Sequence, residues 1–177
     1  FLYCHLAQTL LFLSYIQEIA EGGAIPMITW EPMHMKETAE FEPNGSIKKT
    51  VSSMIPDIIS GSLDENFIRV WATALKNLNR PVIIRWGHEM NNGDSWYPWA
   101  KAKDPDSYKR AFKHIVDIFE QVGATKVYWL FAPNIINGSQ TEKDIIDSYY
   151  PGDNYVDIVG MSGYNDLFTD TAHFNPV

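Results

Sequence analysis

The sequence is poor in cysteine, in basic residues and in long apolar runs. Its one cysteine, Cys4, excludes an internal disulfide and a cysteine-rich zinc site. Fourteen Lys and Arg against 22 Asp and Glu give a net charge of −8, which argues against a nucleic-acid partner because phosphates are bound by basic patches. The longest apolar run, residues 1–16, is interrupted by His5, Gln8 and Thr9, so it is too polar for a membrane span.

The ends of the chain also lack expected signals. Residues 1–16 begin without Met and without a basic segment, so they are not interpreted as an intact signal peptide. The chain stops just after a strand-like segment. We therefore interpret both ends as cuts through a longer protein, with residues 1–177 forming part of one domain.

Strand and helix patterns alternate along the chain. Helical apolar stripes lie before the first strand and over residues 64–78 and 105–122, the last with Asp104 as N-cap and Gly123 as stop, while Thr141 is predicted to cap a further helix. Four apolar runs predict parallel strands that are covered on both faces: residues 24–30, 81–87, 126–131 and 156–161. This alternation predicts an α/β fold, either an open doubly wound sheet or a closed (β/α)8 TIM barrel.

The segments that follow the strands decide between these folds. None of them is a glycine-rich loop, so a nucleotide-binding fold is disfavoured. Polar and aromatic residues follow all four strands instead, and a barrel builds its active site at that end of its strands. We therefore predict a (β/α)8 barrel that is incompletely present.

Glu89 is the best catalytic candidate. It follows a predicted strand, His88 precedes it, and Asn91, Trp96 and Trp99 lie in the loop that it opens. Apolar surroundings raise the pKa of a carboxylic acid, a property that suits a general acid. Aromatic rings match the apolar faces of sugars, and Asn or His can bind hydroxyls. The alternatives are a salt bridge for the carboxyl group and ordinary packing for the rings.

Further candidates follow the other strands. Trp30 and Glu31 end the first strand. Glu31 is either a second carboxylate for glycoside hydrolysis, or a residue that hydrogen-bonds substrate or braces the barrel rim. Asn134 and Tyr164 end the third and fourth strands, where they bind hydroxyls or form turns. The stretch at Glu89 is not a zinc HExxH helix, because Asn92 stands where the second histidine belongs. No metal or other cofactor is indicated.

Several motifs together resemble glycoside hydrolase family 26, whose main members are β-mannanases that fold as (β/α)8 barrels. The resemblance covers about residues 12–165. It rests on Ile25 to Pro32, Arg85 to Asn91, the Trp96-Tyr97-Pro98-Trp99 stretch, and the segment from Val156 to Asn165. It implies that the four predicted strands are barrel strands 3 to 6.

The resemblance also implies roles for single residues. Glu89 matches the acid/base of the family, His88 the conserved histidine beside it, and Trp96 the aromatic residue of the adjoining sugar subsite. Tyr164 resembles the tyrosine that contacts the nucleophile. Trp30 and Glu31 are carried over as substrate contacts on the cleft side of strand 3.

The family's nucleophile is a Glu that closes a later strand, and no Glu follows Tyr164 in this chain. The resemblance therefore predicts a parent protein that is a secreted, retaining endo-β-glycanase, most simply an endo-1,4-β-mannanase acting on a polysaccharide. Its nucleophile would lie outside these 177 residues. The alternative is a non-catalytic glycan-binding or vestigial protein.

Overall fold

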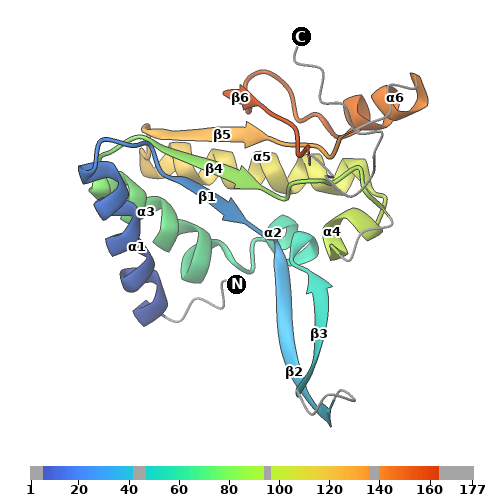
Figure 1. The fold of residues 1–177 in the computed structure, drawn as a ribbon, viewed down its shortest axis with the longest axis horizontal. Coiled ribbons are helices and arrows are strands. Elements are labelled where there is room, and N and C mark those ends of the chain that lie inside the picture. The colour runs from blue at the N-terminus through green and yellow to red at the C-terminus, as the bar shows by residue number, and fades with distance from the viewer. Residues whose placement is uncertain (1–5, 42–46, 94–96, 136–139, 164–177) are drawn as a thin grey trace, which may run out of the picture.

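A parallel four-stranded sheet forms the centre of the molecule (Figure 1). The computed structural model describes residues 6–41, 47–93, 97–135 and 140–163. The strands are β1 (Met27–Trp30), β4 (Val82–Trp86), β5 (Val127–Phe131) and β6 (Ile158–Val159), hydrogen-bonded in the order β1-β4-β5-β6. Spatial order therefore follows chain order without the reversal of a doubly wound sheet, as in consecutive strands of a barrel.

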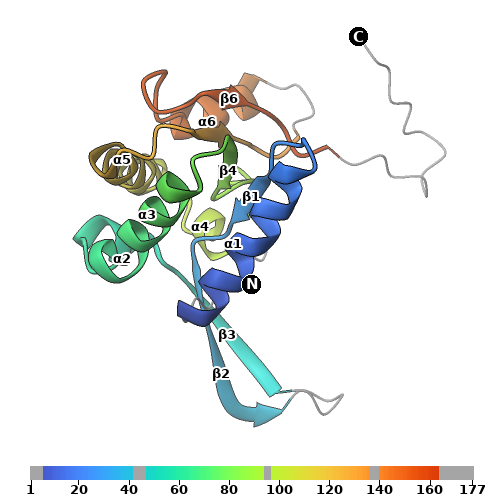
Figure 2. The same ribbon diagram turned by 90° about the vertical axis from the view of Figure 1, so that its left-hand side faces the viewer.

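Helices cover one face of this sheet. The longer ones are α1 (Leu6–Glu21), α3 (Arg69–Leu78), α5 (Pro105–Val122) and α6 (Gln140–Tyr149), and the shorter ones are α2 (Ile55–Ser60), α4 (Pro98–Lys101) and the π-helical turn η1 (Asp64–Ile68) that leads into α3. Figure 2 shows α2, α3 and α5 together on one side of the sheet. Alternate strand side chains, among them Ile84, Trp86 and Trp129, are buried against these helices.

The opposite face of the sheet carries exposed apolar side chains. Met27 on β1 and Tyr128 on β5 are 56% and 41% exposed. Both align with Ile83 of β4 in the strand register, so they belong to one row across the sheet. This is the face that a closed barrel would turn inward.

Helix α5 illustrates how local signals set the boundaries. The Asp104 carboxylate accepts a hydrogen bond from the Ser107 N–H at 3.1 Å, and Pro105 occupies the first turn, where its missing N–H costs nothing. Gly123 ends the helix at a φ of 82°. The predicted range of this helix is therefore confirmed.

Two other boundaries differ from the prediction. The first strand starts at Met27 rather than at residue 24, because the Ala24 N–H still donates to the Ile19 carbonyl at the end of α1. Thr141 lies inside α6, which begins at Gln140, so the prediction that Thr141 caps this helix was wrong. The last strand is also shorter than predicted and spans Ile158–Val159.

An antiparallel hairpin between β1 and α2 was not predicted. Its strands are β2 (Met33–Phe41) and β3 (Ile47–Ser53), and the hairpin projects away from the sheet (Figures 1 and 2). At its base Met33 pairs with Ser53, and the Met54 N–H donates to the Pro32 carbonyl at 2.9 Å. The chain therefore leaves and rejoins the fold at neighbouring points.

Candidate active site

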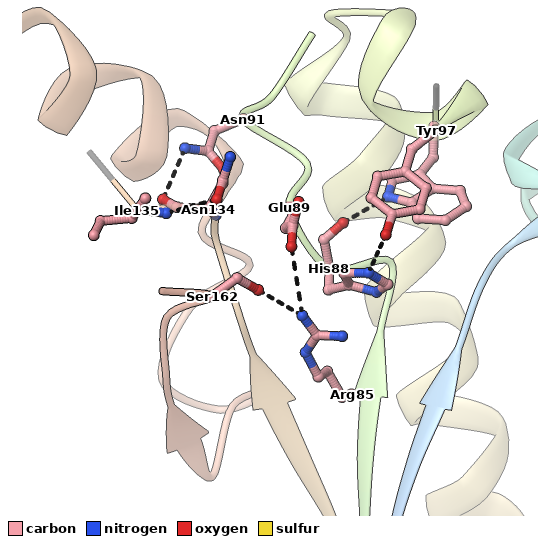
Figure 3. Close-up of polar contacts among 9 residues, drawn as sticks. Arg85, His88, Glu89, Asn91, Tyr97, Asn134, Ile135 and Ser162 are labelled. Atoms are coloured by element: carbon pink, nitrogen blue, oxygen red, sulfur yellow. Dashed lines mark hydrogen bonds and ion pairs between the residues drawn. The ribbon is translucent and has the colours of Figure 1, made fainter. Parts of the chain in front are cut away.

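The polar residues that follow the strands gather at one edge of the sheet. Because parallel strands end on the same side, the segments after β1, β4, β5 and β6 bring Glu31, Glu89, Asn134 and Ser162 to this edge. Figure 3 shows the Glu89 carboxyl group between the Asn91–Asn134 contact on one side and His88 with Tyr97 on the other.

The backbone after β4 fixes the position of Glu89. Gly87 and Glu89 have left-handed φ angles of 52° and 55°, and the Glu89 N–H donates to the Ala132 carbonyl at 2.8 Å. Left-handed backbone is unfavourable for a residue with a side chain, and such strain concentrates at functional sites. The turn holds Glu89 at 7% exposure above the end of the strand.

The Glu89 carboxyl group is close to a cation but does not hydrogen-bond to it. The Arg85 Nη2 lies 3.9 Å from Glu89 Oε1, a loose ion pair, and Oε1 is buried without a hydrogen-bond partner among the described residues. The same Nη2 donates to the Ser162 Oγ at 2.6 Å. The salt bridge considered as the alternative role of Glu89 therefore exists only as this long contact.

His88 is held by two aromatic residues. Its Nε2 is hydrogen-bonded to the Tyr97 hydroxyl at 2.9 Å, and its carbonyl accepts from Trp99 Nε1 at 2.8 Å. Burial, and to a smaller extent the nearby charge of Arg85, lowers the pKa of His88 to about 4. The imidazole is therefore neutral at neutral pH, and its Nδ1 is buried without a hydrogen-bond partner within the described part of the chain.

Two tryptophans predicted as substrate contacts lie in the core. Trp30 is 5% exposed and packs against Phe67 and Phe119, at ring-centroid distances of 5.5 and 6.5 Å. Its side chain therefore lies on the helix side of the sheet, because alternation along β1 turns residue 30 away from the interior face. Trp99 is 1% exposed, with its ring stacked on Tyr97 at 4.5 Å. In this structure neither ring presents a face to a sugar.

Glu31 lies at the same edge of the sheet and, like His88 and Glu89, is close enough to Arg85 to be influenced by its charge. It is partly buried, and burial raises its pKa while the charge of Arg85 lowers it. Arg85 thus acts electrostatically on Glu31 and His88 and forms the loose ion pair with Glu89. One guanidinium therefore links the three titratable side chains nearest the strand ends.

Asn91 and Asn134 bind each other. Asn91 Oδ1 accepts from the Asn134 N–H at 2.7 Å, and Asn91 Nδ2 donates to the Asn134 carbonyl at 3.2 Å. The Asn134 Oδ1 accepts from the Ile135 N–H at 2.9 Å. These amides therefore brace the rim between β4 and β5, and the described residues around Asn134 form a bridge to Ser162 rather than a turn.

The remaining predicted residues, Trp96 and Tyr164, lie outside the described residues. Ser162 was not predicted as a site residue. The parallel pairing of β5 with β6 places it opposite Asn134, so the strand register is the signal that could have found it.

Within the described ranges no group of three or more His, Cys, Asp or Glu could hold a metal ion. No described helix has the length and apolar character needed to cross a membrane.

The fold and the site define an α/β protein of the barrel class with a carboxylate site at the carboxyl ends of its strands. The sequence model of glycosyl hydrolase family 26 matches residues 18–177. The chain belongs to this family, and its fold is part of a (β/α)8 barrel.

Curated relatives and solved structures agree with this assignment. The chain is 38% identical over 156 residues to endoglucanase H of Acetivibrio thermocellus, covering 85% of this chain and 15% of that protein. It is 28% identical over 167 residues to a mannan endo-1,4-beta-mannosidase of Bacillus subtilis, covering 85% of this chain and 42% of that protein. The chain therefore spans less than half the length of these relatives.

Two solved structures show the same fold. A Cellulomonas fimi endo-beta-1,4-mannanase double mutant has a TM-score of 0.64 at 20% identity, covering 90% of this chain and 36% of its own. The match to a family 26 beta-mannanase from Bacteroides ovatus has a TM-score of 0.57 at 20% identity, and it covers 85% of this chain and 44% of the mannanase chain.

Proposed function

We propose that the parent protein is a retaining endo-β-glycanase that hydrolyses β-1,4-mannan, with Glu89 as its general acid/base. The observation that carries this proposal is the Glu89 carboxyl group, buried at a strand end with Oε1 free of hydrogen bonds among the described residues. Family membership and the similarity to mannan endo-1,4-beta-mannosidases support the reaction and the substrate.

In the proposed mechanism Glu89 acts twice. It first protonates the glycosidic oxygen as the leaving group departs, and it then deprotonates the water that attacks the glycosyl-enzyme. The nucleophilic carboxylate would stand about 5–5.5 Å from Glu89, the separation typical of retaining enzymes, and we place it outside these 177 residues.

Neighbouring side chains would bind the sugar. His88 is neutral at neutral pH, so it would serve as a hydrogen-bonding group for a hydroxyl rather than as a proton donor. Glu31 and Asn134 would contact hydroxyls at the rim, and we propose Trp96 as the stacking residue and Tyr164 as the contact to the nucleophile. Because the polysaccharide cannot enter a cell, the proposed activity also implies export of the enzyme.

The test is Glu89→Gln in the protein encoded by the complete open reading frame. We expect hydrolysis of mannan to fall by more than about 100-fold, because a positioned acid/base contributes about 10²- to 10⁴-fold. Cleavage of a dinitrophenyl glycoside should fall much less in its first step, because that leaving group needs no proton. Glu120→Gln, at an exposed position on α5, is the matched control. A variant that keeps more than about a hundredth of the parent rate on mannan contradicts the role of Glu89.

A β-glucan is the second candidate substrate. The observation that favours it is the 38% identity to endoglucanase H, against 28% to the mannosidase of Bacillus subtilis. Reducing-sugar assays on mannan, mixed-linked glucan and xylan distinguish these substrates by their kcat/KM. Binding of the oligosaccharides without hydrolysis of any polysaccharide would support the non-catalytic glycan-binding alternative instead.

A further inference from the structure

The contact between Arg85 and Ser162 crosses the site. Arg85 is on β4 and Ser162 follows β6, with β5 between them, so the arginine side chain reaches over the neighbouring strand (Figure 3). Its Nη2 donates to Ser162 Oγ at 2.6 Å and lies 3.9 Å from Glu89 Oε1, too far for a hydrogen bond. A carboxylate oxygen is normally the stronger acceptor for a guanidinium, so this arrangement calls for a cause.

We propose that Ser162 is a positioning residue that holds the Arg85 guanidinium away from Glu89, so that the Glu89 carboxyl group stays free to carry a transferable proton. This inference rests on the proposed acid/base role of Glu89 and deepens it. It assigns a role to a residue that neither the sequence analysis nor the proposed mechanism names as part of the site.

Ser162 is itself firmly placed. It is 9% exposed, its N–H donates to the Pro133 carbonyl at 2.9 Å, and its carbonyl accepts from the Ile135 N–H at 2.9 Å. These bonds continue the parallel pairing of β5 and β6 past the end of the sheet. The hydroxyl that receives Arg85 is therefore fixed by backbone bonds on both sides.

Several groups lie near Glu89, and Arg85 is the one that forms an ion pair with it among the described residues. Glu31 follows β1, His88 precedes Glu89 and is neutral at neutral pH, and the Tyr97 hydroxyl is engaged with His88. The rim after β5 contributes the uncharged Asn134. Arg85 is therefore the cation that the described part of the chain brings within ion-pair distance of Glu89, and in the complete protein the negative charge of the proposed nucleophile would act on Glu89 beside it.

Removing the hydroxyl should let the guanidinium close on Glu89. The Nη2 to Oε1 distance would shorten from 3.9 Å to about 2.8 Å, the length of a charge-assisted hydrogen bond. At an effective dielectric constant of about 20, this approach favours the ionised carboxylate over the neutral acid by about tenfold. Less of the enzyme would then hold the catalytic proton at neutral pH.

The experiment compares Ser162→Ala and Ser162→Thr in the protein encoded by the complete open reading frame. For Ser162→Ala we expect the high-pH limb of the kcat/KM profile on polysaccharide to move to lower pH by about one unit. On the alkaline side of that limb, kcat/KM should therefore be about tenfold lower than in the parent protein. Glycosylation of the enzyme by a dinitrophenyl glycoside should stay within about twofold, because its leaving group needs no proton. Ser162→Thr keeps the hydroxyl and should restore the profile.

Two controls separate this inference from the proposed function. Ser60→Ala removes an exposed hydroxyl on α2, bonded to the Asp57 carbonyl at 3.0 Å, and should leave the profile unchanged. An unshifted limb in Ser162→Ala, or an equal loss on both substrates, overturns the role of Ser162 while Glu89→Gln still tests the acid/base. If the parent protein hydrolyses nothing, ¹⁵N NMR of the Arg85 guanidinium decides: equal proton-exchange rates with and without the Ser162 hydroxyl overturn the inference.

Discussion

Gly87→Ala should destabilise the protein strongly, because a methyl group there is both strained and crowded. The φ of 52° costs a residue with a side chain roughly 1–2 kcal/mol. The added Cβ would lie 3.0 Å from Tyr108 Cε2 and 3.6 Å from Pro32 Cγ. Tyr108 is fully buried between Trp86 and Tyr149, so it cannot retreat, and overpacking costs about 1–3 kcal/mol.

We therefore expect a loss of about 2–5 kcal/mol in the free energy of unfolding, measured by urea denaturation of the purified protein. Gly123→Ala is the matched control, since its φ is 82° but its Cβ would meet only the end of the Lys76 side chain, at 3.7 Å. That variant should lose about 1–2 kcal/mol. Equal losses in the two variants would show that the contact with Tyr108 carries no cost, and the reasoning would be refuted.

Two further predictions concern α5 and His88. Asp104→Ala removes the carboxylate that accepts from the Ser107 N–H, so we expect urea denaturation to show a loss of about 1 kcal/mol, and an unchanged midpoint would contradict this capping role. The pKa of His88 is lowered from 6.5 to about 4 in the folded protein, so only the unfolded state takes up this proton between these values, and stability should fall as the pH is lowered through that range. His88→Gln should reduce this slope in urea titrations at several pH values, and an identical slope would show that His88 is not its source.

The strand and helix order could be predicted because its signals are local. Apolar runs mark the four parallel strands, and Asp104 and Gly123 mark the ends of α5 in both sequence and structure. The hairpin was missed although β2 places Met33 and Met35 at alternate positions, because its partner β3 carries charged residues such as Lys49 without the apolar alternation that predicts a strand. Pairing with β2 supplies what the pattern of β3 lacks.

Residues of the candidate site could be predicted where their position after a strand is enough to place them. They could not be predicted where the direction of the side chain determines whether the residue faces the site. Glu89 and His88 reach the strand ends by position alone. Trp30 ends a continuous apolar run, which does not tell which face each side chain takes, and the structure turns it toward Phe119. The contact between Arg85 and Ser162 joins residues 77 positions apart, so only the register of the folded sheet reveals it.

The way the hairpin is attached has a consequence for engineering. Because Met33 pairs with Ser53 and Pro32 bonds to Met54, everything between these points is an excursion that starts and ends at one place on the scaffold. Segments of other lengths can therefore be grafted there without changing the spacing of β1 and α2. The position lies directly after β1, so a library of exchanged hairpins would vary the border of the carboxylate site while leaving the sheet that carries Glu89 intact.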